Sequence, residues 1–174
     1  MYKPQYWREG EIVCIDESQC KSYRYSLEVR WGKSGHIIAV VGLNPSTASW
    51  ELDDKTIRQC IDWARGEDGC VGLRMLNAFP FRHKKPKYMK DAEDPFGGQT
   101  PDRVVEMCGH GRVVAAWGND AKHLGRGVAL AAAFSEAAVQ LECWDVNVTG
   151  MPEHPGRIGI GKTKPWPRKS ATTA

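Results

Sequence analysis

Hydrophobic and polar positions follow two different patterns along this chain, and each pattern predicts a different kind of strand. In residues 22–32, aromatic and aliphatic side chains alternate with polar ones, among them Arg24 and Glu28. This alternation is typical of a strand with one buried face, so the polar side chains are expected to face solvent. Residues 36–43 form a continuous apolar run rich in β-branched residues. Such a run favours a strand that is buried on both faces, as in a parallel sheet.

Segments with helical periodicity separate the remaining apolar runs. Residues 53–66 place apolar side chains on one face, with Asp53 or Asp54 available as the helix cap and Gly66 as its end. Further helices are expected at 101–108 and 119–138, and further strands at 71–79, 112–118 and 138–146. This alternation predicts an α/β fold with three α/β/α layers and a central, mainly parallel four-stranded sheet.

Length and composition predict one soluble domain. The 174 residues suit a single domain over 1–160, followed by a flexible basic tail over 161–174 that is rich in Pro, Lys and Thr. No apolar run reaches the length of a membrane span, so no membrane partner is expected. The formal net charge of +3 permits a phosphate-bearing partner but does not require one.

The cysteines and histidines give no sign of a metal or a disulfide framework. The six cysteines are scattered without a C-x-x-C pair, and the five histidines show no H-x-H or H-x-x-x-H spacing. We therefore expect a reduced, cytoplasmic and monomeric protein that has no metal and no cofactor.

Candidate chemistry lies where the strands end, because ligands in parallel α/β sheets bind beyond the carboxyl ends of the strands. The four strand ends carry polar and aromatic residues, in segments 42–46, 77–80, 117–120 and 149–155. A long basic loop, 81–90, follows the second of them. If the sheet is parallel, these segments meet at one edge.

Each of these features also has an ordinary structural explanation. Asn44 and Ser46 would suit a turn that caps the next helix, and a strand-end amide such as Asn77 often satisfies its own backbone. Trp117 would suit plain core packing, and the basic loop a solvated face. His154 lies between two prolines, which suits either a preorganised donor or a surface loop.

Taken in order, the strand ends resemble the motifs of the uracil-DNA glycosylase superfamily. The four segments that carry the likeness are Gly42-Leu43-Asn44-Pro45, Arg74-Met75-Leu76-Asn77, Ala115 to Ala121, and His154-Pro155-Gly156-Arg157. Over residues 22–160 the chain also looks like an uncharacterised family of small bacterial and phage proteins that share an LNPSTA motif, here Leu43 to Ala48.

The resemblance implies a uracil-DNA glycosylase-like fold and a hydrolase that cleaves the N-glycosidic bond of a flipped-out, damaged or modified pyrimidine, uracil or a 5-substituted uracil. Asn44 would then position the water, His154 would donate to the departing base, and Asn77 would read it. The partner would be single- or double-stranded DNA, or a nucleotide. Stacking on the base would come from Trp50, Phe79 or Phe81, and phosphate contacts from Thr47, Arg82, Lys84, Lys85 and Arg157.

Two departures from the superfamily pattern matter for chemistry. Its most active members have Asp where this chain has Asn44, and an amide cannot take a proton. Its uracil-specific members have Tyr where this chain has Ser46, so a 5-substituted pyrimidine is expected to fit. Two other functions stay open: an enzyme of the same fold that acts on a free or modified nucleotide, and a non-catalytic protein that binds nucleic acid or another protein.

Overall fold

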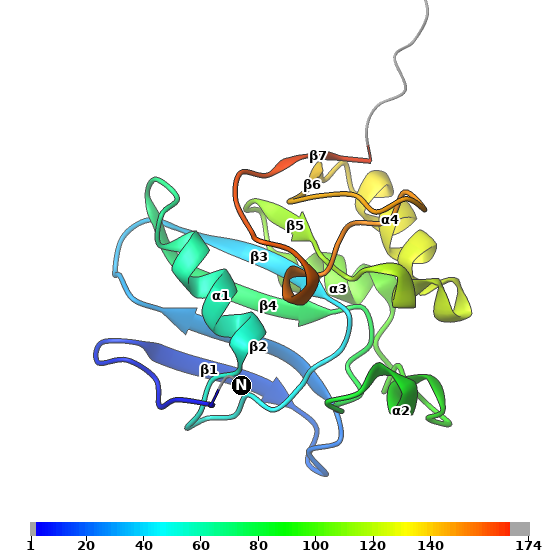
Figure 1. Ribbon diagram of the computed structural model, residues 1–174, viewed down its shortest axis with the longest axis horizontal. Helices are drawn as coiled ribbons and strands as arrows, with labels where there is room; N and C mark the ends of the chain where they lie inside the picture. Colours follow the sequence, from blue (N-terminus) through cyan, green and yellow to red (C-terminus); the bar gives the residue numbers. More distant parts are fainter. Residues whose placement is uncertain (1–2, 168–174) are drawn as a thin grey trace, which may run out of the picture.

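A computed structural model describes residues 3–167 of the chain. Within this range the protein is a mixed α/β structure built on one seven-stranded sheet with the strand order β1-β2-β4-β3-β5-β6-β7 (Figure 1). In chain order the strands are β1 Ile12–Glu17, β2 Arg24–Arg30, β3 His36–Gly42, β4 Cys70–Asn77, β5 Val113–Ala115, β6 Leu141–Cys143 and β7 Lys164–Trp166.

The sheet is larger and more mixed than the sequence predicts. The four strands expected in its centre do pair in parallel, in the order β4-β3-β5-β6. However, β1 and β2 add an antiparallel pair beside β4, and β7 adds an antiparallel strand beside β6. The prediction of a four-stranded sheet is therefore wrong in its extent. Of the three added strands, β2 matches the alternation at residues 22–32, whereas β1 and β7 join the edges through backbone hydrogen bonds, which leave a weak trace in side-chain patterns.

Helices cover both faces of the sheet and make three layers (Figure 1). Helix α1, Lys55–Ala64, packs on one face, and α3, Pro101–Cys108, and α4, Arg126–Glu136, pack on the other. A short helix α2, Pro86–Lys90, lies in the basic loop. Two 3₁₀ turns, η1 Asn119–Gly125 and η2 Pro155–Arg157, follow β5 and β6.

The continuous apolar run of β3 feeds two hydrophobic clusters. Val40 belongs to the cluster under α1, and its neighbour Val41 belongs to the cluster under α3 and α4. This alternation explains why both faces of β3 are apolar. Trp117 is fully buried in the second cluster, where its ring packs edge-on against Trp166 at 5.4 Å between centroids. The Trp117 side chain is therefore part of the hydrophobic core.

Two predicted segments differ from the observed structure. The expected helix at 119–138 is divided, because Leu124 and Gly125, at the end of η1, take positive φ values of 50° and 65° before α4 begins. Part of the expected flexible tail, residues 164–166, instead forms β7, since the buried indole of Trp166 anchors it to the core. Residues 168–174 of that tail lie outside the described residues. Among residues 3–167, no helix is long and apolar enough to cross a membrane.

Candidate functional site

A cavity of about 310 Å³ opens at the carboxyl ends of the parallel strands, on the α1 face. All four strand-end segments contribute to its walls, as the parallel topology predicts. The register places Gly42, the last residue of β3, opposite Asn77, the last residue of β4. Residues at the start of α1 and in the η2 turn line the cavity, and these two elements contact one another.

The Asn44 side chain lines this cavity with a fixed orientation. Its Nδ2 donates to three backbone carbonyl oxygens, those of Pro45 at 3.2 Å, Phe81 at 3.4 Å and His83 at 2.7 Å. Since all three neighbours are acceptors, the amide nitrogen must face them. The carbonyl Oδ1 is left as the atom that can accept a hydrogen bond from a ligand or a water. Asn44 does not cap α1, because Asp54 does.

Asn77 carries an unsatisfied donor at the bottom of the cavity. Its side chain is only 4% exposed, and its Nδ2 has no hydrogen-bond partner among residues 3–167. The amide nitrogen therefore does not satisfy its own backbone. A buried donor left unpaired costs about 1–3 kcal/mol, so its retention points to a ligand or water that pairs with it. Gly42 makes room for the amide, since a Cβ there would lie 3.3 Å from Asn77 Oδ1.

His154 presents a neutral ring to the cavity. Burial, and next the positive charge of Arg157, hold the pKa of His154 below its ordinary value of 6.5. The backbone N–H of Gly156 donates to Nδ1 at 3.0 Å. With Nδ1 acting as acceptor, the proton of the neutral ring is on Nε2. His154 is therefore a hydrogen-bond donor at neutral pH.

Two further charged residues, Arg24 and Asp54, line the cavity; the sequence offered Asp53 or Asp54 chiefly as a helix cap and did not indicate Arg24. Arg24 is only 2% exposed; its Nη1 donates to the carbonyl oxygen of Ala48 at 3.0 Å, and its Nε has no partner within residues 3–167. Burial lowers the pKa of Arg24 to about 10, against the opposing effect of the Asp54 charge, so the guanidinium stays charged at neutral pH. The alternation of β2 predicts a solvent-facing Arg24, which is wrong because the loop that follows β3 covers it.

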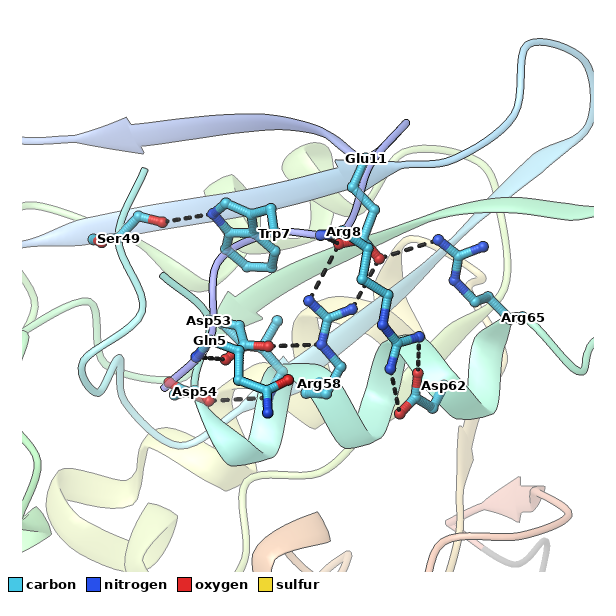
Figure 2. A network of polar contacts seen from close by, with 11 residues as sticks. Gln5, Trp7, Arg8, Glu11, Ser49, Asp53, Asp54, Arg58, Asp62 and Arg65 are labelled. Carbon is cyan, nitrogen blue, oxygen red and sulfur yellow. Dashed lines mark hydrogen bonds and ion pairs between the residues drawn. The ribbon is translucent and has the colours of Figure 1, made fainter. Parts of the chain in front are cut away.

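Asp53 and Asp54, adjacent in sequence, have separate roles. Asp54 lines the cavity, is 8% exposed, and caps α1 by accepting from the backbone N–H of Ile57 at 2.9 Å. Asp53 instead accepts from the backbone N–H of Gln5 and from Arg58 Nε, at 2.9 and 2.6 Å. Figure 2 shows this network between the N-terminal segment and the start of α1. It holds the helix end that carries Asp54.

The three aromatic residues expected to stack on a base do not line the cavity. Phe79 is fully buried in the cluster on the opposite face, 5.5 Å from the ring of Phe96. Phe81 packs edge-on against Tyr23 at 5.8 Å, and Trp50 is 52% exposed. The aromatic rings that do line the cavity are those of Trp117, His154 and His83, and the ring of His83 lies 4.2 Å from the ring of Tyr88. Sequence reasoning missed His83 because it lies in the basic loop.

Only some of the residues predicted to contact phosphates lie at the cavity. Lys84 and Arg157 line the cavity, and so does Ser46, whereas Thr47, Arg82 and Lys85 do not. Arg82 donates to Glu17 at 2.9 Å and so already has a carboxylate partner. Asp120, another lining residue, pairs with Lys90 at 2.5 Å and lies 3.8 Å from Arg157. The cavity thus combines Arg24, Lys84 and Arg157 with two carboxylates, which leaves it close to neutral.

Metal ligation has no support in the described part of the chain. Within residues 3–167, no group of three or more His, Cys, Asp or Glu side chains is arranged to hold a metal ion.

Comparison with known families adds one result. The profile of the family described as "Protein of unknown function (DUF1643)" matches residues 24–156. The chain belongs to the DUF1643 family. The match begins at the buried Arg24 and encloses Asn44, Asn77 and His154, so the cavity lies almost wholly within the DUF1643 region. No curated protein and no solved structure matches the chain.

Proposed function

We propose that this protein is a hydrolase that breaks the N-glycosidic bond of a modified pyrimidine nucleotide in DNA, on a fold related to that of uracil-DNA glycosylases. The observation that supports it best is the set of polar groups in one cavity: the unpaired Nδ2 of Asn77, the oriented Oδ1 of Asn44 and the neutral His154. These groups suit a planar ring that carries both acceptors and donors.

Cleavage of a nucleoside passes through an oxocarbenium-like sugar and a departing base that carries negative charge. His154 Nε2–H is placed to donate to a base oxygen on which that charge develops. Asn77 offers one donor and one acceptor, which match the O4 and N3–H of a uracil ring. Asn44 Oδ1 accepts a hydrogen bond from the attacking water and so positions it. An amide cannot, however, remove the proton of that water.

The size of the cavity limits the substrate. A volume of about 310 Å³ is at the lower end of ligand pockets, so it admits one nucleoside rather than a duplex. A base in DNA would have to flip out of the stack to reach it. Ser46 is a small side chain in the wall, which favours a 5-substituted pyrimidine over strict selection of uracil. Lys84 and Arg157, at the same cavity, are positioned to contact phosphates.

A second candidate is an enzyme that acts on a free or modified nucleotide. The observation in its favour is that the cavity contains both cations and carboxylates, and that Arg82 and Lys90 are already paired with Glu17 and Asp120. Fewer cations are then available for a long DNA backbone. A non-catalytic binder would use the same cavity without turnover.

A base-release assay tests the proposal. Short single- and double-stranded DNA carrying uracil, 5-hydroxymethyluracil, thymine opposite guanine, or hypoxanthine would be incubated with the protein and probed for alkali-labile sites. We expect cleavage at one pyrimidine, lost in Asn44→Ala and His154→Ala and kept in His110→Ala, an exposed histidine outside the cavity. No cleavage of any substrate by the folded protein would contradict a glycosylase, and release from free nucleotides would favour the second candidate.

A further inference from the structure

We infer that Asp54 is the carboxylate that accepts the proton of the attacking water, and that the buried Arg24, at the same cavity, supplies its counter-charge. This inference rests on the proposed function, because it assigns to Asp54 the proton transfer that the amide of Asn44 cannot perform. Both residues line the cavity, and neither belongs to the strand-end motifs.

Capping of α1 uses only half of the Asp54 side chain. Oδ1 accepts from the backbone N–H of Ile57 at 2.9 Å, which fixes the side chain against the helix. Oδ2 accepts no hydrogen bond within the part of the chain that the structure describes. Because Asp54 is 8% exposed and lines the cavity, Oδ2 is the oxygen available to a water there.

Arg24 gives this carboxylate a permanent counter-charge. The guanidinium lies in the Coulomb field of Asp54 and is almost completely buried, with its Nε unpaired in residues 3–167. Burying opposite charges costs free energy that a simple cap does not require, since Asn or Ser caps a helix as well as Asp. Helix α3 illustrates the simpler solution: Thr100 caps it with a hydroxyl that accepts from Arg103 N at 3.2 Å.

Asp54 and His154 face the same cavity. The reaction requires this, because one residue must act on the attacking water and the other on the departing base. The Asp54 charge acts on the His154 ring, and η2, which His154 caps, contacts α1. A substrate between them would have its base near His154 and Asn77 and its sugar toward Asn44 and Asp54. The carboxylate would also stabilise the positive charge that develops on the sugar.

The step balances as a hydrolysis. The water oxygen bonds to C1′ while the bond from C1′ to the base nitrogen breaks, and that electron pair leaves on the base. The water proton goes to Asp54 Oδ2, and the base anion, stabilised by His154 Nε2–H, takes a proton from solvent. Asp54 returns its proton to solvent, and no oxidant, reductant or metal is needed.

Asp54→Asn and Asp54→Ser test this role, because both keep a capping oxygen and remove the charge. We expect the single-turnover rate of base release to fall about 10²–10⁴-fold, with substrate affinity and melting temperature little changed. The matched control is Asp62→Asn on the exposed side of the same helix, where Asp62 pairs with Arg8 at 2.8 Å. Arg24→Lys should keep more activity than Arg24→Gln, since the lysine retains the charge.

A binding measurement tests the same role without turnover. Oligonucleotides would carry either a cationic pyrrolidine or a neutral tetrahydrofuran in place of the deoxyribose. We expect the wild type and Asp62→Asn to prefer the cationic ring, and Asp54→Asn to lose that preference.

The outcomes separate the two proposals. Base release by Asp54→Asn at the wild-type rate would overturn the inference. So would an equal preference for the cationic ring in the wild type and in Asp54→Asn. No preference in the wild type would overturn it as well. If the wild type released no base but showed a preference that depends on Asp54, the glycosylase proposal would fail while the assignment of Asp54 as the cavity's charge-stabilising group would stand.

Discussion

Buried donors of the cavity residues Arg24 and Asn77 have no hydrogen-bond partner within residues 3–167. Asn77 has an unpaired Nδ2, whereas Asn147 accepts from the backbone N–H groups of Thr149 and Met151 at 3.0 and 3.2 Å. The same side chain therefore has two uses in one chain. Asn147 Oδ1 stabilises its own loop, and we propose that the Nδ2 of Asn77 is kept for a ligand.

Replacing each asparagine by alanine should distinguish these uses. Asn147→Ala removes at least two hydrogen bonds, at about 0.5–1.5 kcal/mol each, and should lower the free energy of unfolding without affecting base release. Asn77→Ala loses no bond from Nδ2, so it should cost less stability while base release falls at least about 10²-fold. Urea denaturation and the release assay give both quantities. Unchanged base release by Asn77→Ala would contradict the base-reading role.

The depressed pKa of His154 should appear in the pH dependence of stability. The unfolded chain takes up the histidine proton near pH 6.5, whereas the folded ring, depressed by burial and by Arg157, takes it up only at lower pH. This contribution to stability is fully present above pH 6.5 and is lost as the pH falls from there through the folded pKa.

His154→Asn provides the comparison, because its Oδ1 can still accept from the N–H of Gly156. Arg157, Asp54 and Asp120, the charged groups that act on the ring, are unchanged. We expect the variant to lose less free energy of unfolding between pH 7.5 and 5.5 than the wild type. Chemical denaturation at each pH would measure this. Identical losses of free energy of unfolding in the two proteins would show that the pKa of His154 is not depressed.

The start of α1 is the element on which the site depends most. Arg58 pairs with Asp53 at 2.6 Å and with Glu11 at 2.9 Å, and the two carboxylate side chains are fully buried (Figure 2). Burial opposes ionisation of Glu11, but hydrogen bonds from Arg58, Arg8 and Arg65 outweigh it, and its pKa is lowered overall. The network ties the N-terminal segment to the helix end that carries Asp54.

Arg58→Ala should be among the most destabilising substitutions in α1. It removes the Arg58 charge from two buried carboxylates, and breaking a buried ion pair by removing one partner costs about 3–5 kcal/mol. Arg8→Ala breaks the exposed pair with Asp62 in the same region and should cost no more than about 1 kcal/mol. Thermal and urea unfolding would measure both. Similar losses for the two variants would mean that the buried network does not hold α1.

The distribution of charge over the whole molecule bears on the proposed partner. Lys84 and Arg157 lie at the cavity, whereas Lys33 lies in the turn before β3, at the opposite end of that strand. A chain with a net charge of only +3 is expected to bind nucleic acid through such a local cluster rather than through its overall charge.

Salt titrations of DNA binding should identify that cluster. We expect Lys84→Glu and Arg157→Glu to weaken binding of single-stranded DNA and to reduce the slope of log K against log salt by about 0.7 for each lost phosphate contact. Lys33→Glu should leave the slope unchanged. Fluorescence anisotropy at several salt concentrations measures it. If none of the three variants changed the slope, the proposed phosphate contacts of Lys84 and Arg157 would be contradicted.

Much of the fold follows from the sequence alone, because local patterns report burial. The β-branched run of residues 36–43 determined a central strand, and the apolar spacing and cap of residues 53–66 determined α1. Polar residues at strand ends also placed Asn44, Asn77 and His154 together, since parallel strands end at one edge.

Only the tertiary structure decided the rest, because periodicity does not report long-range pairing. The pairing of β7 with β6 and of β2 with β4 depends on backbone hydrogen bonds between segments that are far apart in the sequence. Arg24 occupies a polar position in an alternating strand, and only the loop laid over it makes it a buried charge beside Asp54. Phe79 follows a strand end yet turns to the opposite face, where the core offers more apolar contact than the cavity does. Sequence thus determined which elements form, and packing decided which side chains face the cavity.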